Sequence, residues 1–376
     1  MRKGPHPLLV HLGMAAINMK GIQEYASSFS GALTQTDAVN MVRGMKMYQA
    51  HEFIAEEMPV DVIWQEGGMS VKSPVMLQAI TPSENSVPLL IVPSLINKAN
   101  ILDISEEQSM LRWFNQHGID TYMLDWGDLK CPQEKSINIE ALIQDMLPKA
   151  IQAVSKKTGK KVDVVGYCMG GVLLLAGYHY AQDHIRRMVL LASPWDFHTG
   201  SSPLARNVRI WSPMVLPVVR DRGCLPAEWV QALFASLDTK GSAQKFIRFA
   251  SMDQSSSEAE LFVSVEDWLN DGVDLPANIA QHCIQDWFVK NDLASGTWFV
   301  AGRNVDLSKI NTQILIIASK NDMLVPYDCA LSVECSLSIA DVDVISPTCG
   351  HIGLIVGRHA KKSVWQPMLD WLKNNN

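Results

Sequence analysis

The sequence predicts an α/β protein built on a mostly parallel, doubly wound sheet. The first observation is a regular alternation of short β-branched or apolar runs with helical patterns from residue 88 onward. The second is a glycine-rich turn directly after one of the strand-like runs, at residues 166–171. The third is composition, because 376 residues with 47% hydrophobic and 19% charged side chains suit a globular protein with a large core.

The alternation assigns elements in chain order. Ser105-Glu-Glu-Gln108 has the form of a capping box and predicts the start of a helix that ends at Gly118. A second helix closes near Gly159. Because strands separated by helices form βαβ units, the pattern predicts parallel pairing. The expected strands are residues 89–92, 119–126, 162–165 and 188–192, and the expected helices are 105–118, 139–157 and 172–180.

This regularity stops at Ser193-Pro-Trp-Asp-Phe197 and returns with strands at 314–318 and 342–345 and a closing helix at 366–374. An insertion of this length between sheet strands is typical of a cap over an active site. We therefore expect a helical cap subdomain at 194–306. The sheet core is expected at 61–193 and 307–376, and an N-terminal helical region at 1–60.

Within that N-terminal region, helical patterning is clearest at 37–48, with Asp37 as the expected N-cap and methionines facing a core. Runs at 62–64 and 75–80 suggest edge strands. The apolar stretch from Pro7 to Ile17 superficially resembles a signal peptide. His11 and Gly13 interrupt it and no cleavage site follows, so we favour a retained helix packed on the body or on an apolar surface.

The net charge and the cysteine pattern argue against several classes of function and of structural site. A net charge of −7 argues against binding nucleic acid. Seven cysteines without a CxxC pair argue against a disulfide framework or a zinc site, and favour a reducing, cytoplasmic location. No apolar run approaches the roughly 20 residues of a membrane span. We expect neither a metal nor a transmembrane segment.

The turn Gly166-Tyr-Cys-Met-Gly170 joins a predicted strand to a predicted helix. Strand, Gly-x-nucleophile-x-Gly turn and helix form the nucleophile elbow of the α/β-hydrolase fold, here with Cys168 in place of serine. Side chains at Gly166 and Gly170 would collide with the neighbouring strand and helix. The helix N-terminus favours a thiolate. The alternative is a buried, inert cysteine in a glycine-rich turn.

In this fold the acid and the histidine follow the nucleophile, each in a loop after a later strand. Asp322 follows the strand 314–318, and His351 follows the strand 342–345. Alone, Asp322 could be a turn former and His351 an ordinary satisfied histidine. Together they predict a Cys168–His351–Asp322 triad. The oxyanion hole should use the Met169 N–H and a second N–H, from Leu95 or Ile96.

These motifs resemble those of the polyhydroxyalkanoate synthases over about residues 88–360, and the length is closer to the short catalytic subunits of that family. Three departures are the absence of the long N-terminal region of single-component synthases, Ser-Lys-Asn-Asp322 where the family usually has Arg-Glu-Asp, and a cap that is only loosely similar. The matching motifs are Pro88-Leu-Leu-Ile-Val-Pro-Ser-Leu-Ile-Asn-Lys98, Tyr122-Met-Leu-Asp-Trp126, Gly166-Tyr-Cys-Met-Gly-Gly171, Trp268-Leu-Asn-Asp-Gly-Val-Asp-Leu-Pro276, Gly302-Arg-Asn-Val-Asp-Leu307, Asn321-Asp-Met-Leu-Val-Pro326 and Gly350-His-Ile-Gly353.

The resemblance implies an acyltransferase that polymerises 3-hydroxyacyl-CoA through an acyl group on Cys168 and releases CoA, with no other cofactor. It also implies the growing polyester as a partner, a second synthase subunit or a homodimer, and a location at the polymer granule surface. The alternative is a thiol hydrolase of the same fold, such as a polyester depolymerase, esterase or thioesterase. A third possibility is a non-catalytic granule-binding or scaffold protein.

Overall fold

The computed structural model describes Arg2, Gly4 and residues 35–76, 86–129, 137–200 and 202–374. The chain divides into two compact units, of which the smaller comprises Met1–Glu57 and Pro226–Gly272. The larger comprises Met58–Leu225 and Val273–Asn376 and holds every residue of the predicted site. The stretch from Pro7 to Ile17 lies outside the described residues, so its predicted retained helix stays a prediction.

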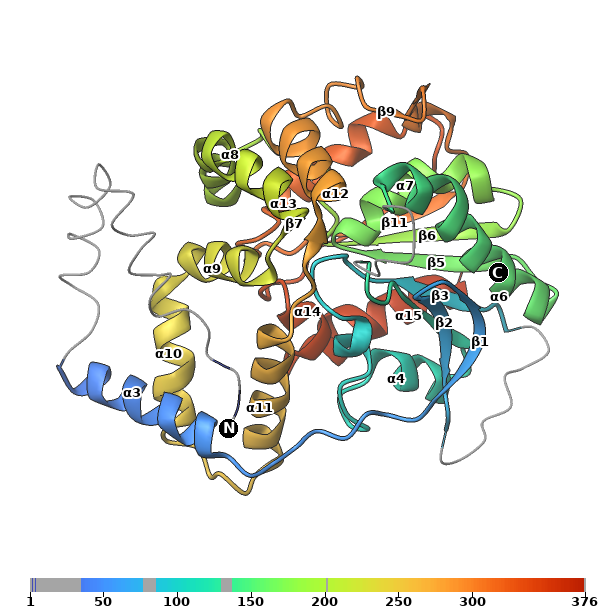
Figure 1. Cartoon of the computed structure of the whole chain (residues 1–376). Helices are drawn as coiled ribbons and strands as arrows, with labels where there is room; N and C mark the ends of the chain where they lie inside the picture. The colour runs from blue at the N-terminus through green and yellow to red at the C-terminus, as the bar shows by residue number, and fades with distance from the viewer. Residues whose placement is uncertain are drawn as a thin grey trace. The chain divides into compact units, whose positions relative to one another are not determined.

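An eight-stranded sheet forms the centre of the larger unit, in the order β1-β2-β4-β3-β5-β6-β11-β12 (Figure 1). From β4 to β12 every pair is parallel, whereas β1 and β2 pair antiparallel with each other and β2 with β4. The predicted α/β-hydrolase fold with a mostly parallel sheet is confirmed. The strands are β1 (Val60–Glu66), β2 (Met69–Pro74), β3 (Leu89–Val92), β4 (Thr121–Asp125), β5 (Val162–Tyr167), β6 (Ile185–Leu191), β11 (Gln313–Ile317) and β12 (Val342–Ile345).

The second edge strand begins earlier than the predicted run at 75–80. A tight turn at Gly67, whose φ is +58°, reverses the chain directly after β1, so Met69 pairs with Glu66. The strand β2 therefore occupies 69–74, and Val75 and Met76 lie beyond it. Residues 77–80, the remainder of the predicted run, lie outside the described residues.

Helix α4 (Met110–Gln116) starts later than the capping box suggests. The Gln108 N–H does bond to Ser105 Oγ at 3.1 Å, but this closes only a local turn. The N-cap is Ser109, whose Oγ accepts from the Arg112 N–H at 2.9 Å. The helix ends before Gly118, as expected.

The helix predicted at 139–157 is present, with a π-helical turn in its middle, and Gly159 caps it with φ of +69°. The apolar helix after the glycine-rich turn is α7, which covers the face of the sheet opposite α4 and α15 (Figure 1). The bounds of the helical segments in this part of the larger unit are η1 (Ala99–Leu102), α5 (Ile139–Ala141), η2 (Leu142–Met146), α6 (Leu147–Thr158) and α7 (Met169–Ala181).

Residues 194–306 contain helices and two short antiparallel strand pairs, and none of their described residues joins the parallel sheet, as the sequence predicts. They contribute to both compact units, and the predicted core and cap boundaries stay a prediction. The larger unit holds α8 (Pro203–Arg222), β7 (Cys224–Leu225), β8 (Leu275–Pro276), α12 (Ala277–His282), η3 (Cys283–Val289), β9 (Phe299–Val300), β10 (Arg303–Asn304), η4 (Leu307–Lys309), α13 (Tyr327–Leu331), η5 (Ser332–Ser336), α14 (Gly353–Val356), η6 (Lys361–Trp365) and α15 (Gln366–Asn374).

The smaller unit has its own apolar core around Tyr48, Phe246 and Phe249. Methionines of α3 pack against this core, which confirms the predicted role of the methionine stripe. Asp37 lies in the first turn of α3 and not at its N-cap, because the helix begins two residues earlier. The helices are α3 (Gln35–Ala50), α9 (Ala227–Leu237), α10 (Thr239–Phe249) and α11 (Ser257–Asn270).

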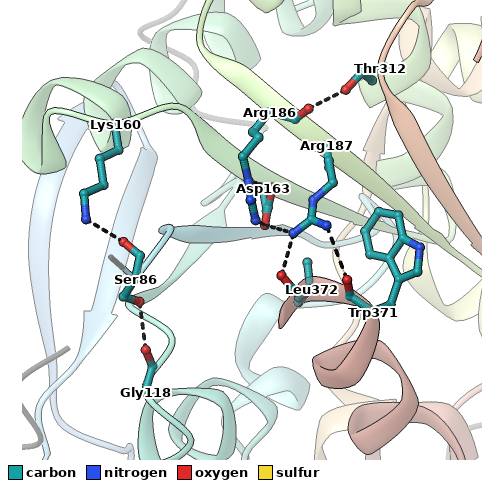
Figure 2. A network of polar contacts seen from close by, with 9 residues as sticks. All are labelled: Ser86, Gly118, Lys160, Asp163, Arg186, Arg187, Thr312, Trp371 and Leu372. Atoms are coloured by element: carbon teal, nitrogen blue, oxygen red, sulfur yellow. Dashed lines mark hydrogen bonds and ion pairs between the residues drawn. The ribbon is translucent and has the colours of Figure 1, made fainter. Parts of the chain in front are cut away.

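A buried ion network ties the C-terminal helix to the sheet (Figure 2). Arg187 on β6 lies 3.4 Å from Asp163 on β5 and donates to the Leu372 carbonyl at 2.5 Å. Its guanidinium also lies 4.7 Å from the centre of the Trp371 ring. The last carbonyls of a helix lack intrahelical donors, so this buried arginine satisfies the end of α15 and fixes it against the sheet.

Candidate active site

Cys168 stands between the end of β5 and the start of α7, with φ of 54° and ψ of −122°. A positive φ is strained for a residue with a Cβ and persists only where the surroundings enforce it. Here the Cys168 N–H bonds to the Leu191 carbonyl of β6 at 2.9 Å, and its carbonyl accepts from the Gly171 N–H at 3.1 Å. The turn therefore presents Cys168 at the N-terminus of the helix, as an elbow does.

The two glycines of the turn are sterically required, as the sequence predicts. A Cβ on Gly166 would lie 2.3 Å from the Gly171 Cα in the helix. A Cβ on Gly170 would lie 2.2 Å from the Val92 carbonyl oxygen at the end of β3. Real Cβ atoms never approach so closely, so any larger residue would push strand and helix apart.

Asp322 and His351 come from different loops and meet next to the elbow. Asp322 follows β11 and His351 follows β12, and 2.6 Å separates His351 Nδ1 from Asp322 Oδ2. The other carboxylate oxygen, Oδ1, accepts from the N–H groups of Leu324 at 2.8 Å and Val325 at 2.9 Å. The Asp322 side chain is 0% exposed. Both of its oxygens therefore have partners within the protein.

Burial alone would lower the pKa of His351, because desolvation disfavours the imidazolium. The charges of Asp322 and Cys168, together with hydrogen bonds to both side chains, outweigh it and raise the pKa of His351 well above its usual value. Since Nδ1 faces Asp322, the nitrogen that faces Cys168 is Nε2. The structure thus brings together all three residues of the predicted triad.

Two residues next to this constellation were not singled out from the sequence. Tyr167 stacks on the His351 ring, with ring centres 5.1 Å apart and planes at 24°. Ser319 lies two residues after the end of β11, and its hydroxyl contacts the backbone of Pro347 and Cys349 in the histidine loop. Ser319 belongs to the segment that departs from the synthase pattern, which is the one signal that could have drawn attention to it.

The predicted oxyanion donors lie in two places. Met169 is the first residue of α7. Leu95 and Ile96 follow β3, where the Trp126 indole anchors the loop by donating to the Pro93 carbonyl at 3.0 Å. The Ile96 N–H points to Ser94 Oγ at 3.4 Å. That Leu95 or Ile96 supplies the second N–H donor stays a prediction, and the choice between them stays open.

Two further polar side chains, one at a strand end and one near His351, are held by the surrounding structure. Asp125, at the carboxyl end of β4, pairs with Lys72 at 2.5 Å and accepts from the Gly127 N–H. The Cys349 thiol is half-buried, and burial raises its pKa. Within the described residues no group of three or more His, Cys, Asp and Glu side chains could hold a metal ion. None of the described helices is both long enough and apolar enough to span a membrane.

Comparison with known proteins shows which sequences this chain resembles. Residues 57–114 match the family described as poly-beta-hydroxybutyrate polymerase (PhaC) N-terminus. The poly(3-hydroxyalkanoate) polymerase subunit PhaC of Haloferax mediterranei is 26% identical over 317 residues, which is 83% of this chain and 63% of that protein. The subunit of the same name from Allochromatium vinosum is 27% identical over 293 residues, covering 77% and 82%.

Solved structures include a serine hydrolase from Cycloclasticus zankles at 14% identity and a TM-score of 0.47, covering 85% of this chain and 99% of that one. A likeness at this level concerns the fold alone, and the fold is already fixed by the strand order. The sequence relatives instead extend over most of the chain. The chain is therefore similar in sequence to the poly(3-hydroxyalkanoate) polymerase subunits PhaC over most of its length, and its sheet has the strand order of the α/β-hydrolase fold.

Proposed function

We propose that this protein is an acyltransferase that polymerises 3-hydroxyacyl-CoA into a polyhydroxyalkanoate and releases CoA. The observation that carries the proposal is the buried Asp322–His351 contact beside Cys168 at the elbow. The names of the relatives supply the substrate class, since they are called poly(3-hydroxyalkanoate) polymerases. CoA enters as part of the substrate, and no further cofactor is needed.

In the first step His351 Nε2 takes the proton from the Cys168 thiol. The thiolate attacks the thioester carbonyl of a 3-hydroxyacyl-CoA, and N–H donors such as that of Met169 stabilise the oxyanion. The C–S bond to CoA then breaks, and the CoA sulfur takes the proton from His351. One thioester replaces another, so the step is nearly balanced, whereas a serine ester would be a less activated acyl donor.

In the second step the hydroxyl of another 3-hydroxyacyl group gives its proton to His351 and attacks the acyl-cysteine carbonyl. The new C–O bond forms the polymer ester, and the C–S bond to Cys168 breaks. The Cys168 sulfur recovers the proton from His351, and the enzyme is ready for another acyl group. Each cycle releases one CoA and adds one ester to the chain.

Asp322 acts in both steps through His351. Its Oδ1 is held by two backbone N–H groups, its Oδ2 by the imidazole, and none of its side chain is exposed. A substrate hydroxyl would have to displace one of these partners to reach it. We therefore assign Asp322 the role of orienting His351 and stabilising the imidazolium, in preference to direct deprotonation of the hydroxyl.

Water competes with the substrate hydroxyl for the acyl-cysteine. Polymerisation therefore needs water to be excluded, which gives the insertion at 194–306 a purpose as a cap. We also propose that the enzyme works in the cytoplasm at the surface of a polymer granule, with a second synthase subunit or as a homodimer. The relatives from Haloferax mediterranei and Allochromatium vinosum are named as subunits, which supports a partner.

The deciding experiment is to incubate the pure protein with 3-hydroxybutyryl-CoA and to analyse both products. CoA release with an insoluble or oligomeric polyester is the expected result. CoA release with only free 3-hydroxybutyrate would support the thiol hydrolase. No CoA release, with a Cys168 thiol unreactive to iodoacetamide, would support a non-catalytic scaffold.

A further inference from the structure

The side chain that contacts the His351 ring face belongs to the residue before Cys168. Tyr167 is the last residue of β5 and is 4% exposed. Its ring lies 5.1 Å from the His351 ring at 24°, close to a parallel stack. Its hydroxyl donates to the backbone carbonyl of His351 at 3.3 Å. One side chain thus contacts both the ring and the backbone of His351.

We propose that Tyr167 is a positioning residue that holds His351 in register with Cys168 and stabilises its imidazolium form. The inference rests on the proposed function, in which His351 takes the Cys168 proton. Asp322 fixes the edge of the His351 ring through Nδ1, and Tyr167 fixes the face. With edge and face both held, Nε2 keeps one direction, toward the cysteine.

Chain connectivity makes this arrangement specific. A single peptide bond joins Tyr167 to Cys168, and the Cys168 N–H is held by the Leu191 carbonyl at 2.9 Å. The same stretch of backbone therefore positions both Cys168 and the Tyr167 ring on which His351 stacks. A displacement of the histidine loop relative to the elbow would therefore disturb the stack.

The ring face has an electrostatic role as well. The face of an aromatic ring is negative and attracts a cation placed over it, more strongly where water is excluded. His351 is cationic when it holds the cysteine proton, and both rings are buried. Burial and the nearby Cys168 and Asp322 charges raise the pKa of Tyr167 well above its usual value, so Tyr167 stays a neutral hydroxyl donor.

The test uses alkylation of Cys168 by iodoacetamide across a range of pH, which reports the cysteine–histidine pair without requiring polymerisation. Tyr167→Met removes the ring at similar volume, and we expect about tenfold slower alkylation near pH 7 and a profile displaced upward by about one pH unit. Tyr167→Phe keeps the ring and should stay within about twofold of wild type. A folded Tyr167→Met variant with an undisplaced profile would overturn the inference, as would an equal displacement in Tyr167→Phe.

Because Tyr167→Met removes a buried ring, it could fail to fold. Pentafluorophenylalanine at position 167 keeps the shape and reverses the charge distribution of the ring, so its profile should be displaced upward relative to Tyr167→Phe. Equal profiles would overturn the inference. Tyr178→Phe is the matched control, because Tyr178 is buried, bonds to Asn311 at 2.7 Å and lies on α7 away from the elbow. It should leave the profile unchanged.

The same assay separates this inference from the proposed function. If wild-type Cys168 reacts no faster than in His351→Gln, the histidine does not activate the cysteine and the proposed function fails. If wild type is faster but the variants at position 167 match it, only the role of Tyr167 fails.

Discussion

Both oxygens of the Asp322 carboxylate accept hydrogen bonds within the protein. Two backbone N–H groups donate to Oδ1, and the His351 imidazole contacts Oδ2. A carboxylate held in this way can orient an imidazole and stabilise its charge. It has no free oxygen with which to deprotonate an incoming hydroxyl. We therefore propose that His351 accepts the proton in both half-reactions, and single substitutions can test this proposal.

Asp322→Asn and His351→Gln should each slow the release of the first CoA from 3-hydroxybutyryl-CoA by about a thousandfold or more, because triad members act as a unit. Rapid-quench measurement of that first release, before any ester bond forms, isolates acylation from chain growth. If Asp322→Asn acylated at the wild-type rate and lost only chain growth, Asp322 would be the direct base for the hydroxyl.

The raised pKa of His351 also links stability to pH. A group with a raised folded-state pKa stabilises the folded protein fully below its unfolded value, about 6.5 for histidine, and this contribution is lost as pH rises through the folded value. The free energy of unfolding of wild type relative to His351→Gln should therefore fall as pH rises above about 6.5. Urea unfolding of both proteins across neutral and alkaline pH measures it.

In Cys168→Ala one of the two side chains that raise the pKa of His351 is absent, so the fall should still begin near pH 6.5 but should be smaller and end at lower pH. A difference in unfolding free energy that stayed constant, or grew with pH, would contradict the assigned direction of the shift.

At the scale of elements, the junction of β3, β5 and α7 depends on glycine. Gly170→Ala would place a Cβ 2.2 Å from the Val92 carbonyl oxygen, a backbone atom that cannot move without the strand. We expect a loss of about 3 kcal/mol in the free energy of unfolding. The matched control on the same helix is Gly177→Ala, whose Cβ would meet the Ile143 carbonyl at 3.3 Å and should change stability by less than about 1 kcal/mol.

Chemical denaturation of the two alanine variants, followed by circular dichroism, provides the comparison. Equal stabilities would show that the elbow tolerates a side chain at position 170. The tight packing inferred between α7 and the end of β3 would then be wrong.

Elements with strong local patterns were predictable. The buried run of β3, the strand–turn–helix of the elbow and the Gly159 cap each carry their information within a few residues. Errors arose where two local signals compete. Ser105 and Ser109 can both cap a helix, and only the tertiary contacts of Arg112 with Asp103 decide for the second. The start of β2 depends on the Gly67 turn, which the alternation of apolar residues does not reveal.

The candidate site, like the fold, was predictable only in part. Chain order and strand position predicted Cys168, Asp322 and His351 as a triad, and these three residues lie together in the structure. The contact of Tyr167 with His351 was not predictable, because it joins residues far apart in sequence and depends on the path of two loops. The second oxyanion donor stays open for the same reason, since it depends on backbone direction rather than on residue type.

At the scale of the whole molecule, the relatives are named as subunits, and we propose that activity depends on association. If only an associated form is fully competent, specific activity should rise with protein concentration in step with the fraction of oligomer. Sedimentation and CoA release measured on one dilution series test this. A monomer with constant polymerase activity at every dilution, and no gain on adding extract from the native cell, would contradict the proposal.

The proposed function depends most on an acyl group carried by Cys168, and intact-protein mass spectrometry detects such a group directly. Protein mixed with 3-hydroxybutyryl-CoA and quenched in acid should gain the mass of one or more 3-hydroxybutyryl units, and fragmentation should locate them on the peptide that contains Cys168. Cys168→Ala should gain none and retain the wild-type circular dichroism spectrum. An acyl adduct that persisted in Cys168→Ala, or CoA release by that variant at the wild-type rate, would contradict the account.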